Sequence, residues 1–361
     1  MTLKSGRSKS ESTTGDLEGQ VARKVVSESL RLKKGESLTV ETWNNGLPLA
    51  RRVVIEARRV GAIPITLFED EDTYVYSVKN APRDAVGKMG KHEYQLLAAT
   101  DAYFFIPNEL LEAYTKRLTP EEVDLSTTYG SSWYDAAEKA RLRGARMSFG
   151  FAGKGLSRIL GRSLKEITTI QLKATLVDFG ALKTKGDELG SRLPGKATGV
   201  LTSGGSKLEF EFEEGIGIED GVVDETDVST GHNMAYLPPG RVMKNVKAGS
   251  ANGRVKLSPT MTWLGMVDDA VLEFESGKLV GWSSKSSKKV LDSLIEGQPE
   301  NERVMSRLTI GLNPLMRYGY GQDGFVAGSI GLGGLDFSGT VRSGTLQVDK
   351  AVVVDKGKLA D

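Results

Sequence analysis

The sequence predicts an α/β protein: an N-terminal parallel-sheet α/β domain followed by a β-rich α+β C-terminal domain. Three observations lead to this prediction. The 361 residues are enough for about two domains. Helical and strand patterns alternate through the first half, which favours parallel strands joined by helices. Beyond Gly195, glycine-rich turns separate short strands of alternating apolar residues, which is typical of antiparallel sheets.

The first helix and the first strand follow from local patterns. Leu17, Val21 and Val25 are spaced four apart and share one helical face, with Asp16 as a suitable N-cap. A glycine turn then leads into the alternating segment Ser37–Trp43, which predicts a strand.

The following segments continue the alternation. Pro48 suits the first turn of a second helix, and Gly61 suits its C-terminal end. Short apolar strands begin at Ala62 and Ala102, and residues 131–151 predict a helix followed by a strand. This order indicates a parallel sheet covered by helices.

One long helical pattern covers residues 163–189, and the character of the chain changes near Gly195. The predicted organisation is therefore a disordered tail at residues 1–16, an α/β domain at 17–195 and a β-rich domain at 196–361. The tail is assigned from its serine, threonine and basic residues and its lack of an apolar run.

Composition excludes several classes of protein. Lys and Arg (48) balance Asp and Glu (47), which disfavours a nucleic-acid partner. The absence of cysteine excludes disulfides and thiolate metal sites, and two histidines, His92 and His232, argue against a zinc site with several His ligands. No apolar run is long enough to span a membrane, so we expect a cytoplasmic protein with no membrane contact.

Several segments could carry chemistry. The loop Gly150–Ser157 lies where phosphate-binding loops occur, but its spacing does not match theirs, so we interpret it as an ordinary loop. Gly331 and Gly333 could let the backbone approach a ligand or could form a tight packed turn. His232 could be a ligand or a general base, or an ordinary loop residue.

Acidic residues in the C-terminal half have a simpler interpretation. Glu209, Glu211 and Glu213 alternate with apolar residues, so they share the solvated face of a strand. A metal cluster there is the less favoured interpretation.

Four motifs occur in an order that carries a family resemblance: the turn Gly221–Asp224 with Asn233 after it, the turn Leu237–Val242, the strand Gly253–Val255, and the segment ending at Pro314. In this order they resemble the thermophilic metallo-aminopeptidases, the leucyl aminopeptidase-like family of aminopeptidase T and aminopeptidase S. The opening βαβ pattern is also similar. The resemblance implies an aminopeptidase-like C-terminal domain, homodimers, and two divalent ions held by glutamates, histidines and an aspartate.

This sequence departs from the family at the positions that match its metal ligands. Arg241 and Arg307 stand at two glutamate positions, and Ser329 stands at a histidine position. Gln322 and Asp323 fall in an acidic segment of the family, and Asp336 is the acid nearest its last ligand motif. An arginine carries a positive charge and has no lone pair to offer a metal.

The resemblance and these departures together predict an aminopeptidase T-like protein that has lost its dinuclear metal site. It would act as a non-peptidase binding or assembly protein with no cofactor. Arg241 and Arg307, in the cavity that the resemblance implies, could hold a carboxylate or phosphate. Alternatively, they could pair with Asp323 or Asp336 as a structural lock. His232, Asn313, Gly331 and Gly333 would complete the pocket.

An active enzyme stays open as the alternative. It would be a metal-dependent aminopeptidase that uses Zn, Co or Mn with non-standard ligands and removes N-terminal residues from peptides. The expected partners are a second copy of the chain and a peptide or small anionic ligand.

Overall fold

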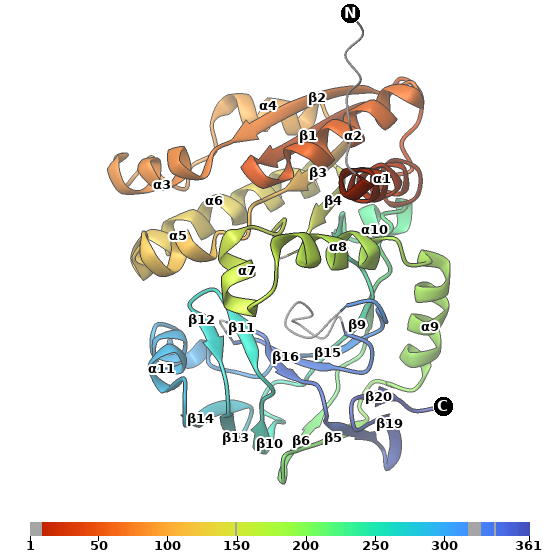
Figure 1. Cartoon of the computed structure of the whole chain (residues 1–361). Coiled ribbons are helices and arrows are strands. Elements are labelled where there is room, and N and C mark those ends of the chain that lie inside the picture. The colour runs from red at the N-terminus through yellow and green to blue at the C-terminus, as the bar shows by residue number, and fades with distance from the viewer. Residues whose placement is uncertain (1–8, 149, 317–325, 336) are drawn as a thin grey trace, which may run out of the picture. The chain divides into compact units, whose positions relative to one another are not determined.

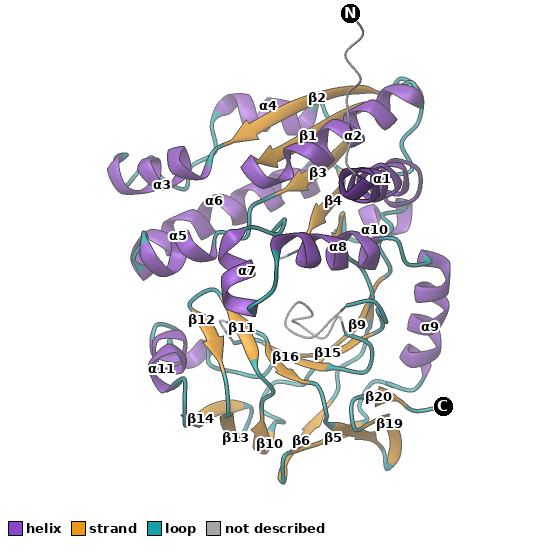
Figure 2. Cartoon of the chain, viewed as in Figure 1, coloured by secondary structure: helices purple, strands orange, loops and turns teal. Residues whose placement is uncertain are grey.

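The computed structural model describes residues 9–148, 150–316, 326–335 and 337–361, and it divides the chain into two compact units (Figure 1). Unit 1 comprises Met1–Leu176 and Gly221–Pro238, and unit 2 comprises Val177–Asp220 and Pro239–Asp361. Helices accompany the strands of unit 1, whereas strands dominate unit 2 (Figure 2). The structure therefore confirms an α/β fold with a parallel sheet and a β-rich part.

Unit 1 is built on a five-stranded parallel sheet with the strand order β2-β1-β3-β4-β8. Its strands are β1 (Ser37–Trp43), β2 (Ile63–Glu69), β3 (Ala102–Ile106), β4 (Arg143–Met147) and β8 (Met234–Leu237). Its helices are α1 (Lys9–Lys24), the π-helical turn η1 (Val25–Ser29), the 3-10 turn η2 (Asn44–Gly46), α2 (Leu47–Arg59), α3 (Glu71–Asn80), α4 (Lys91–Ala98), α5 (Leu111–Lys116), α6 (Pro120–Lys139), α7 (Lys154–Leu160), α8 (Leu164–Thr175) and α10 (Glu225–Ser229).

Local signals explain the ends of several helices. Pro48 lies in the first turn of α2, and Gly61 follows its C-cap with φ 87°. The Thr119 side chain and Glu122 form a capping box, so α6 begins eleven residues before the helix that the sequence predicted from residue 131. Asp70 caps α3 by accepting a hydrogen bond from Thr73 N at 2.9 Å.

The long helical pattern at residues 163–189 is two helices rather than one. Helix α8 ends at Thr175, and α9 (Phe179–Ser191) begins after Asp178, whose carboxylate accepts a hydrogen bond from Ala181 N at 2.9 Å. This N-cap outweighs the continuous apolar periodicity. The two units also divide between these helices, so the boundary predicted near Gly195 falls inside unit 2.

The chain returns to unit 1 before it completes unit 2. Strand β8 pairs in parallel with β4, with Ala145 opposite Ala235, and this pairing assigns residues 221–238 to unit 1. The Pro238–Pro239 step is therefore where the chain leaves unit 1. At the other end of the unit, α1 already begins at Lys9, within the segment predicted as a tail.

Unit 2 contains three antiparallel sheets and two α-helices among its described residues. The eight-stranded sheet has the order β14-β13-β10-β6-β5-β18-β19-β20, the five-stranded sheet has the order β17-β16-β15-β9-β7, and β11 pairs with β12. Its elements are α9, β5 (Thr198–Ser203), β6 (Ser206–Glu211), β7 (Gly217–Glu219), β9 (Arg241–Asn245), β10 (Asn252–Lys256), β11 (Thr260–Thr262), β12 (Gly265–Val267), β13 (Ala270–Glu275), β14 (Lys278–Ser284), α11 (Lys288–Glu296), the 3-10 turn η3 (Glu300–Glu302), β15 (Arg307–Gly311), β16 (Ile330–Gly333), β17 (Gly339–Val341), β18 (Thr345–Val348), β19 (Ala351–Asp355) and β20 (Lys358–Leu359).

Period-two alternation was a reliable guide in unit 2. Leu208 and Phe210 of β6, and Phe212 just after it, are buried, while Glu209 and Glu213 between and beyond them are exposed. The predicted solvated acidic face of this strand is confirmed.

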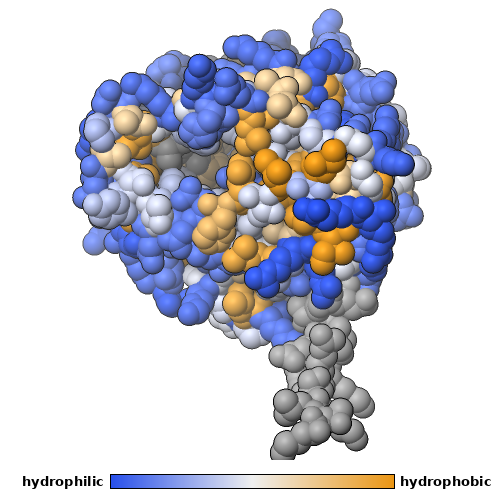
Figure 3. Space-filling view, turned by 90° about the horizontal axis from the view of Figure 1, so that it is seen from above, coloured by the Kyte–Doolittle hydropathy of each residue, from blue (hydrophilic) through white to orange (hydrophobic). Residues whose placement is uncertain are grey.

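Strand β2 is an edge of the parallel sheet, and its side chains are unusually apolar for an exposed edge. Ile63, Ile65 and Phe68 are 64%, 45% and 54% exposed. Seen from above, this side of the molecule shows apolar side chains grouped among charged ones (Figure 3). Within the described part of the chain, no helix is long and apolar enough to cross a membrane.

Candidate functional site

The register of the parallel sheet aligns one residue from each strand in a row. The successive cross-strand partners on β2, β1, β3, β4 and β8 are Leu67, Glu41, Phe105, Arg146 and Tyr236. Cross-strand partners in a sheet point to the same face and stand about 4.8 Å apart. The row therefore places a carboxylate and a guanidinium on one face, on either side of an aromatic ring.

A second row lies at the carboxyl ends of the strands. Trp43, the last residue of β1, stands opposite Glu69, the last residue of β2. Trp43 follows Glu41 by two residues, so both side chains and that of Glu69 share the same face. The result is a compact group of two carboxylates and an indole.

A cavity of about 640 Å³ lies on this face, entirely within unit 1. It opens where the chain order reverses, because β1 has β2 on one side and β3 on the other. In open α/β sheets, ligands bind in the crevice at such a switch point, outside the carboxyl ends of the strands. The cavity has the position and size of a small-molecule site.

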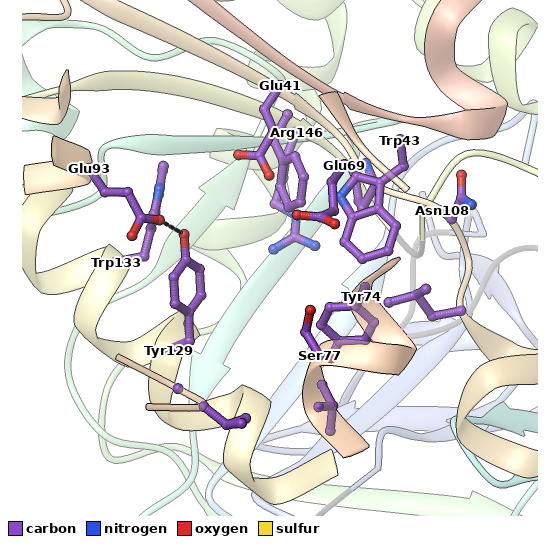
Figure 4. A pocket seen from close by; sticks show the side chains of 18 of the residues that line it. Glu41, Trp43, Glu69, Tyr74, Ser77, Glu93, Asn108, Tyr129, Trp133 and Arg146 are labelled. Carbon is purple, nitrogen blue, oxygen red and sulfur yellow. Dashed lines mark hydrogen bonds between the residues drawn. The ribbon is translucent and has the colours of Figure 1, made fainter. Parts of the chain in front are cut away.

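The lining of the cavity is aromatic and acidic. Its aromatic residues are Trp43, Tyr74, Phe105, Tyr114, Tyr129, Trp133 and Tyr134. Its charged residues are Glu41, Glu69, Glu93, Glu109 and Arg146, so the described lining contains no lysine and no histidine. The Arg146 guanidinium and the carboxyl groups of Glu41 and Glu69 point toward the same space (Figure 4).

Arg146 is held by aromatic groups. Its Nη1 donates a hydrogen bond to the Tyr134 hydroxyl at 2.9 Å. Its guanidinium carbon lies 5.3 Å from the centre of the Phe105 ring and 5.9 Å from that of Tyr236. Such stacking fixes the plane of the guanidinium and leaves donors directed at the cavity.

Burial changes the protonation of the carboxyl group in the middle of the row. It raises the pKa of Glu41 to about 7, although the Tyr103 hydroxyl donates a hydrogen bond to this carboxyl and opposes the rise. The nearby Glu69 carboxylate raises the pKa of Glu41 further. Burial also raises the pKa of Glu69 itself. Perturbed carboxyl groups that converge in a cavity are typical of functional sites.

The other two acids have structural partners. Glu93 accepts hydrogen bonds from the Tyr129 hydroxyl (the dashed line in Figure 4) and from Gly90 N at the start of α4. Glu109 accepts a hydrogen bond from Gly155 N at 3.0 Å, at the start of α7. Burial raises the pKa of Glu109 to about 7, although this hydrogen bond lowers the pKa and so opposes the rise.

The position of Glu109 supports our interpretation of the loop Gly150–Ser157. A phosphate-binding loop presents the backbone N–H groups at a helix start to an anion. Here the protein's own carboxylate accepts that hydrogen bond. Gly150 has φ 76°, and a Cβ at this position would clash with the Asn108 carbonyl, so the loop packs directly against the end of β3.

Three buried polar atoms of the lining have no hydrogen-bond partner among the described residues. They are Trp43 Nε1, Glu109 Oε2 and Arg146 Nε. Trp43 is only 6% exposed. Because an unpaired buried polar atom is costly, it indicates a place where water or a ligand completes the hydrogen bonding.

The register of unit 2 sets the spacing of the two arginines, for which the family resemblance implied a shared cavity. In the antiparallel pair β9–β15, Arg241 stands opposite Gly311 and Arg307 stands opposite Asn245. They are therefore four strand residues apart, or about 13 Å along the strand. The expectation that both surround one small anion gains no support from this register.

The other predicted pocket residues of unit 2 bond to the main chain or lie in a strand ladder. Ser329 Oγ donates to Val326 O at 2.7 Å, and Ser329 is almost fully buried. Asn313 is fully buried, and its Nδ2 donates to Pro239 O at 2.7 Å, which holds the turn before Arg241. Gly331 and Gly333 are ladder residues of β16, where Gly333 stands opposite Arg307.

His232 lies in unit 1, on the exposed turn after α10, and its Nδ1 is 3.1 Å from the Thr230 hydroxyl. It does not line the cavity described above. Gln322, Asp323 and Asp336 lie outside the described residues.

The residues at the three described family-ligand positions do not fit a divalent metal. Two are arginines and one is a serine whose hydroxyl bonds to the main chain. Throughout the described ranges, no three His, Cys, Asp or Glu side chains gather in a group that could hold a metal ion.

Comparisons with known proteins support the fold. No protein-family model and no curated protein sequence matches the chain. Wild-type AmpT from Thermus thermophilus, an aminopeptidase T, has 14% identity and a TM-score of 0.69 over 96% of this chain and 99% of AmpT. The structure of 2,5-dihydroxypyridine dioxygenase from Pseudomonas putida has 13% identity and a TM-score of 0.58 over 97% of each chain.

These likenesses extend over nearly the whole chain, and at such identity they show the fold alone. The chain has a remote aminopeptidase-like fold. The two named activities differ, so this fold is compatible with more than one chemistry.

Sequence reasoning missed the cavity residues of unit 1. Glu41, Trp43, Glu69 and Arg146 all lie at or near the carboxyl ends of strands. A polar residue at that end of a predicted parallel strand was the available signal. Their convergence depends on the strand order, which the sequence did not specify.

Proposed function

We propose that this chain is a binding protein with an aminopeptidase-like fold, and that its ligand occupies the cavity of unit 1. One observation carries the proposal: buried polar atoms without partners converge in a cavity at the switch point of a parallel sheet. Two of them belong to Trp43 and Arg146, whose side chains are held in place by packing and stacking.

The proposal includes the absence of peptidase activity. Arg241 and Arg307 replace carboxylates at positions that resemble the family's ligands, and a guanidinium repels divalent cations. Without a metal ion, a metallopeptidase has neither an activated water nor a Lewis acid. A single small anion held by both arginines is not part of this proposal, because they stand four residues apart along the strand pair.

A fragment screen by ligand-observed NMR on the full chain tests the binding site. Ser77, on α3, lines the cavity at an exposed position, whereas Lys79 on the same helix is exposed and does not line it. We expect Ser77→Trp to abolish the signals of fragments that bind wild-type protein, and Lys79→Trp to preserve them. Fragments that bind all three proteins equally would contradict the assignment of the site.

A second experiment tests the non-peptidase proposal. The protein is incubated with excess Zn, Co and Mn and desalted, its metal content is measured by mass spectrometry, and hydrolysis of amino-acid amides is assayed. We expect no stoichiometric metal and no turnover. Stoichiometric metal with turnover would instead support the alternative, an active aminopeptidase with non-standard ligands.

The expected homodimer and the expected cytoplasmic location stay predictions. Light scattering coupled to size-exclusion chromatography would measure the molar mass and so test the homodimer.

A further inference from the structure

Two acidic side chains of the cavity lie close together on the sheet. Glu41 and Glu69 lie on neighbouring strands, on the same face, with Trp43 beside both. Neither carboxylate forms an ion pair within 4.0 Å among the described residues. Two neighbouring carboxylates raise the cost of ionising each other, so a positive group placed between them is stabilised.

The only cation of the described lining is already engaged. Arg146 is separated from Glu41 by the intervening strand β3, about 10 Å away at the backbone. Its guanidinium lies over Phe105 and Tyr236 and donates to Tyr134. The Arg146 charge lowers the pKa of Glu41, but no ion pair within 4.0 Å joins Arg146 to either carboxylate among the described residues, so their oxygens are available to a group that comes from outside.

The surrounding walls favour an organic cation over a metal ion. The Trp43 and Tyr74 rings meet edge to face with their centres 5.1 Å apart, and both line the cavity. Aromatic faces attract ammonium groups and accept apolar substituents. A hard metal ion such as calcium requires six or more oxygen ligands, which an aromatic wall does not offer.

We propose that the cavity binds a protonated organic amine that carries a flat apolar body. The ammonium group faces Glu41 and Glu69, and the body lies against Trp43 and Tyr74. This inference rests on the proposed function, since it names the ligand class of the same cavity. It also gives Trp43 Nε1 and Arg146 Nε a role, as donors to a polar substituent of the ligand.

Three probes of similar shape and different charge test the class: phenethylamine, 2-phenylethanol and 3-phenylpropionate. Calorimetric titration of the full chain is done at about pH 8, where a primary amine stays protonated and the Glu41 carboxyl group, with a pKa of about 7, is mostly ionised. We expect the amine to bind roughly tenfold more tightly than either other probe. Equal binding of amine and alcohol, or tighter binding of the propionate, would overturn the class.

Variants identify the groups responsible. We expect Glu69→Gln to weaken the binding of phenethylamine roughly tenfold and to change the affinity for 2-phenylethanol less than about twofold. Only the amine depends on the charge of the carboxylate. Glu121→Gln is the matched control, since that side chain is 77% exposed on α6 and does not line the cavity. Circular dichroism checks folding, and the comparison of probes on wild-type protein needs no variant. An unchanged amine affinity in Glu69→Gln would contradict the assignment.

The outcomes separate this inference from the proposed function. If fragments bind in a Ser77-dependent way but the amine has no advantage, the ligand class is wrong and the binding site stands. If neither the three probes nor any fragment depends on Ser77, both proposals fail.

Discussion

Replacing Glu41 by glutamine should stabilise the protein in a pH-dependent way. The pKa of Glu41 is raised to about 7 from its ordinary 4.5, mainly by burial. In the unfolded chain this carboxyl ionises near 4.5, while in the folded chain it keeps its proton up to about 7. The folded state therefore binds more protons across this window, so wild-type stability falls as the pH rises through it.

The size of the effect follows from the same values. A difference of about 2.5 between the two pKa values corresponds to about 3 kcal/mol. Glutamine has no charge to desolvate, and its side-chain oxygen can still accept the hydrogen bond from Tyr103. The stability of Glu41→Gln relative to wild type should rise by about 3 kcal/mol between about pH 4.5 and pH 8.

Urea denaturation at several pH values measures this difference. Two of the four tryptophans, Trp43 and Trp133, lie in unit 1. Replacing Trp263 and Trp282 by phenylalanine in both proteins therefore makes the fluorescence report on unit 1 alone. The quantity of interest is how the difference in unfolding free energy between Glu41→Gln and wild type changes with pH. Its absolute value matters less, because the substitution also has pH-independent costs.

The control for this experiment is Glu121→Gln, which removes an exposed carboxylate. The difference in unfolding free energy between this variant and wild type should depend little on pH. If Glu41→Gln also gives a flat difference, or one that falls as the pH rises, the carboxyl group is not a desolvated acid. The electrostatic account of the cavity would then be wrong.

Three further predictions concern the fold around the sites. Asn313→Ala removes two hydrogen bonds between a fully buried side chain and the main chain, and it should lower the free energy of unfolding by about 2–3 kcal/mol in urea denaturation. A loss below about 0.5 kcal/mol would contradict a structural role for Asn313. Gly150→Ala should destabilise by more than about 1 kcal/mol because of its positive φ and its clash, while Gly130→Ala, in α6 with open space around it, should stabilise by about 0.5–1 kcal/mol. Arg241→Ala and Arg307→Ala should be additive within about 0.5 kcal/mol, and a larger coupling in the double-mutant cycle would contradict their separation.

Several elements could be predicted because their signals are local. Strand β1 occupies Ser37–Trp43, as its alternation indicated, and Pro48 lies in the first turn of α2 as expected. The acidic face of β6 followed from period two. In each case, neighbouring residues in the sequence determine both conformation and burial, so no distant contact is needed.

Local signals can also conflict, and only the structure shows which one dominates. Residues 163–189 have helical periodicity throughout, yet Asp178 starts a new helix and the units divide just before it. The motifs that resemble the aminopeptidases correctly indicated the fold, because they reflect turns and strand ends. They could not establish that Arg241 and Arg307 meet, since the antiparallel register sets their distance.

The sequence by itself determined the α/β class, several of the strands and the balance of charge that this chain carries. The tertiary structure alone decided which side chains form a site. Glu41, Phe105 and Arg146 are 64 and 41 residues apart along the chain, as their numbers give, and they meet because β1, β3 and β4 are neighbours in register. Strand order and register depend on long-range pairing and helix packing, which no local pattern encodes.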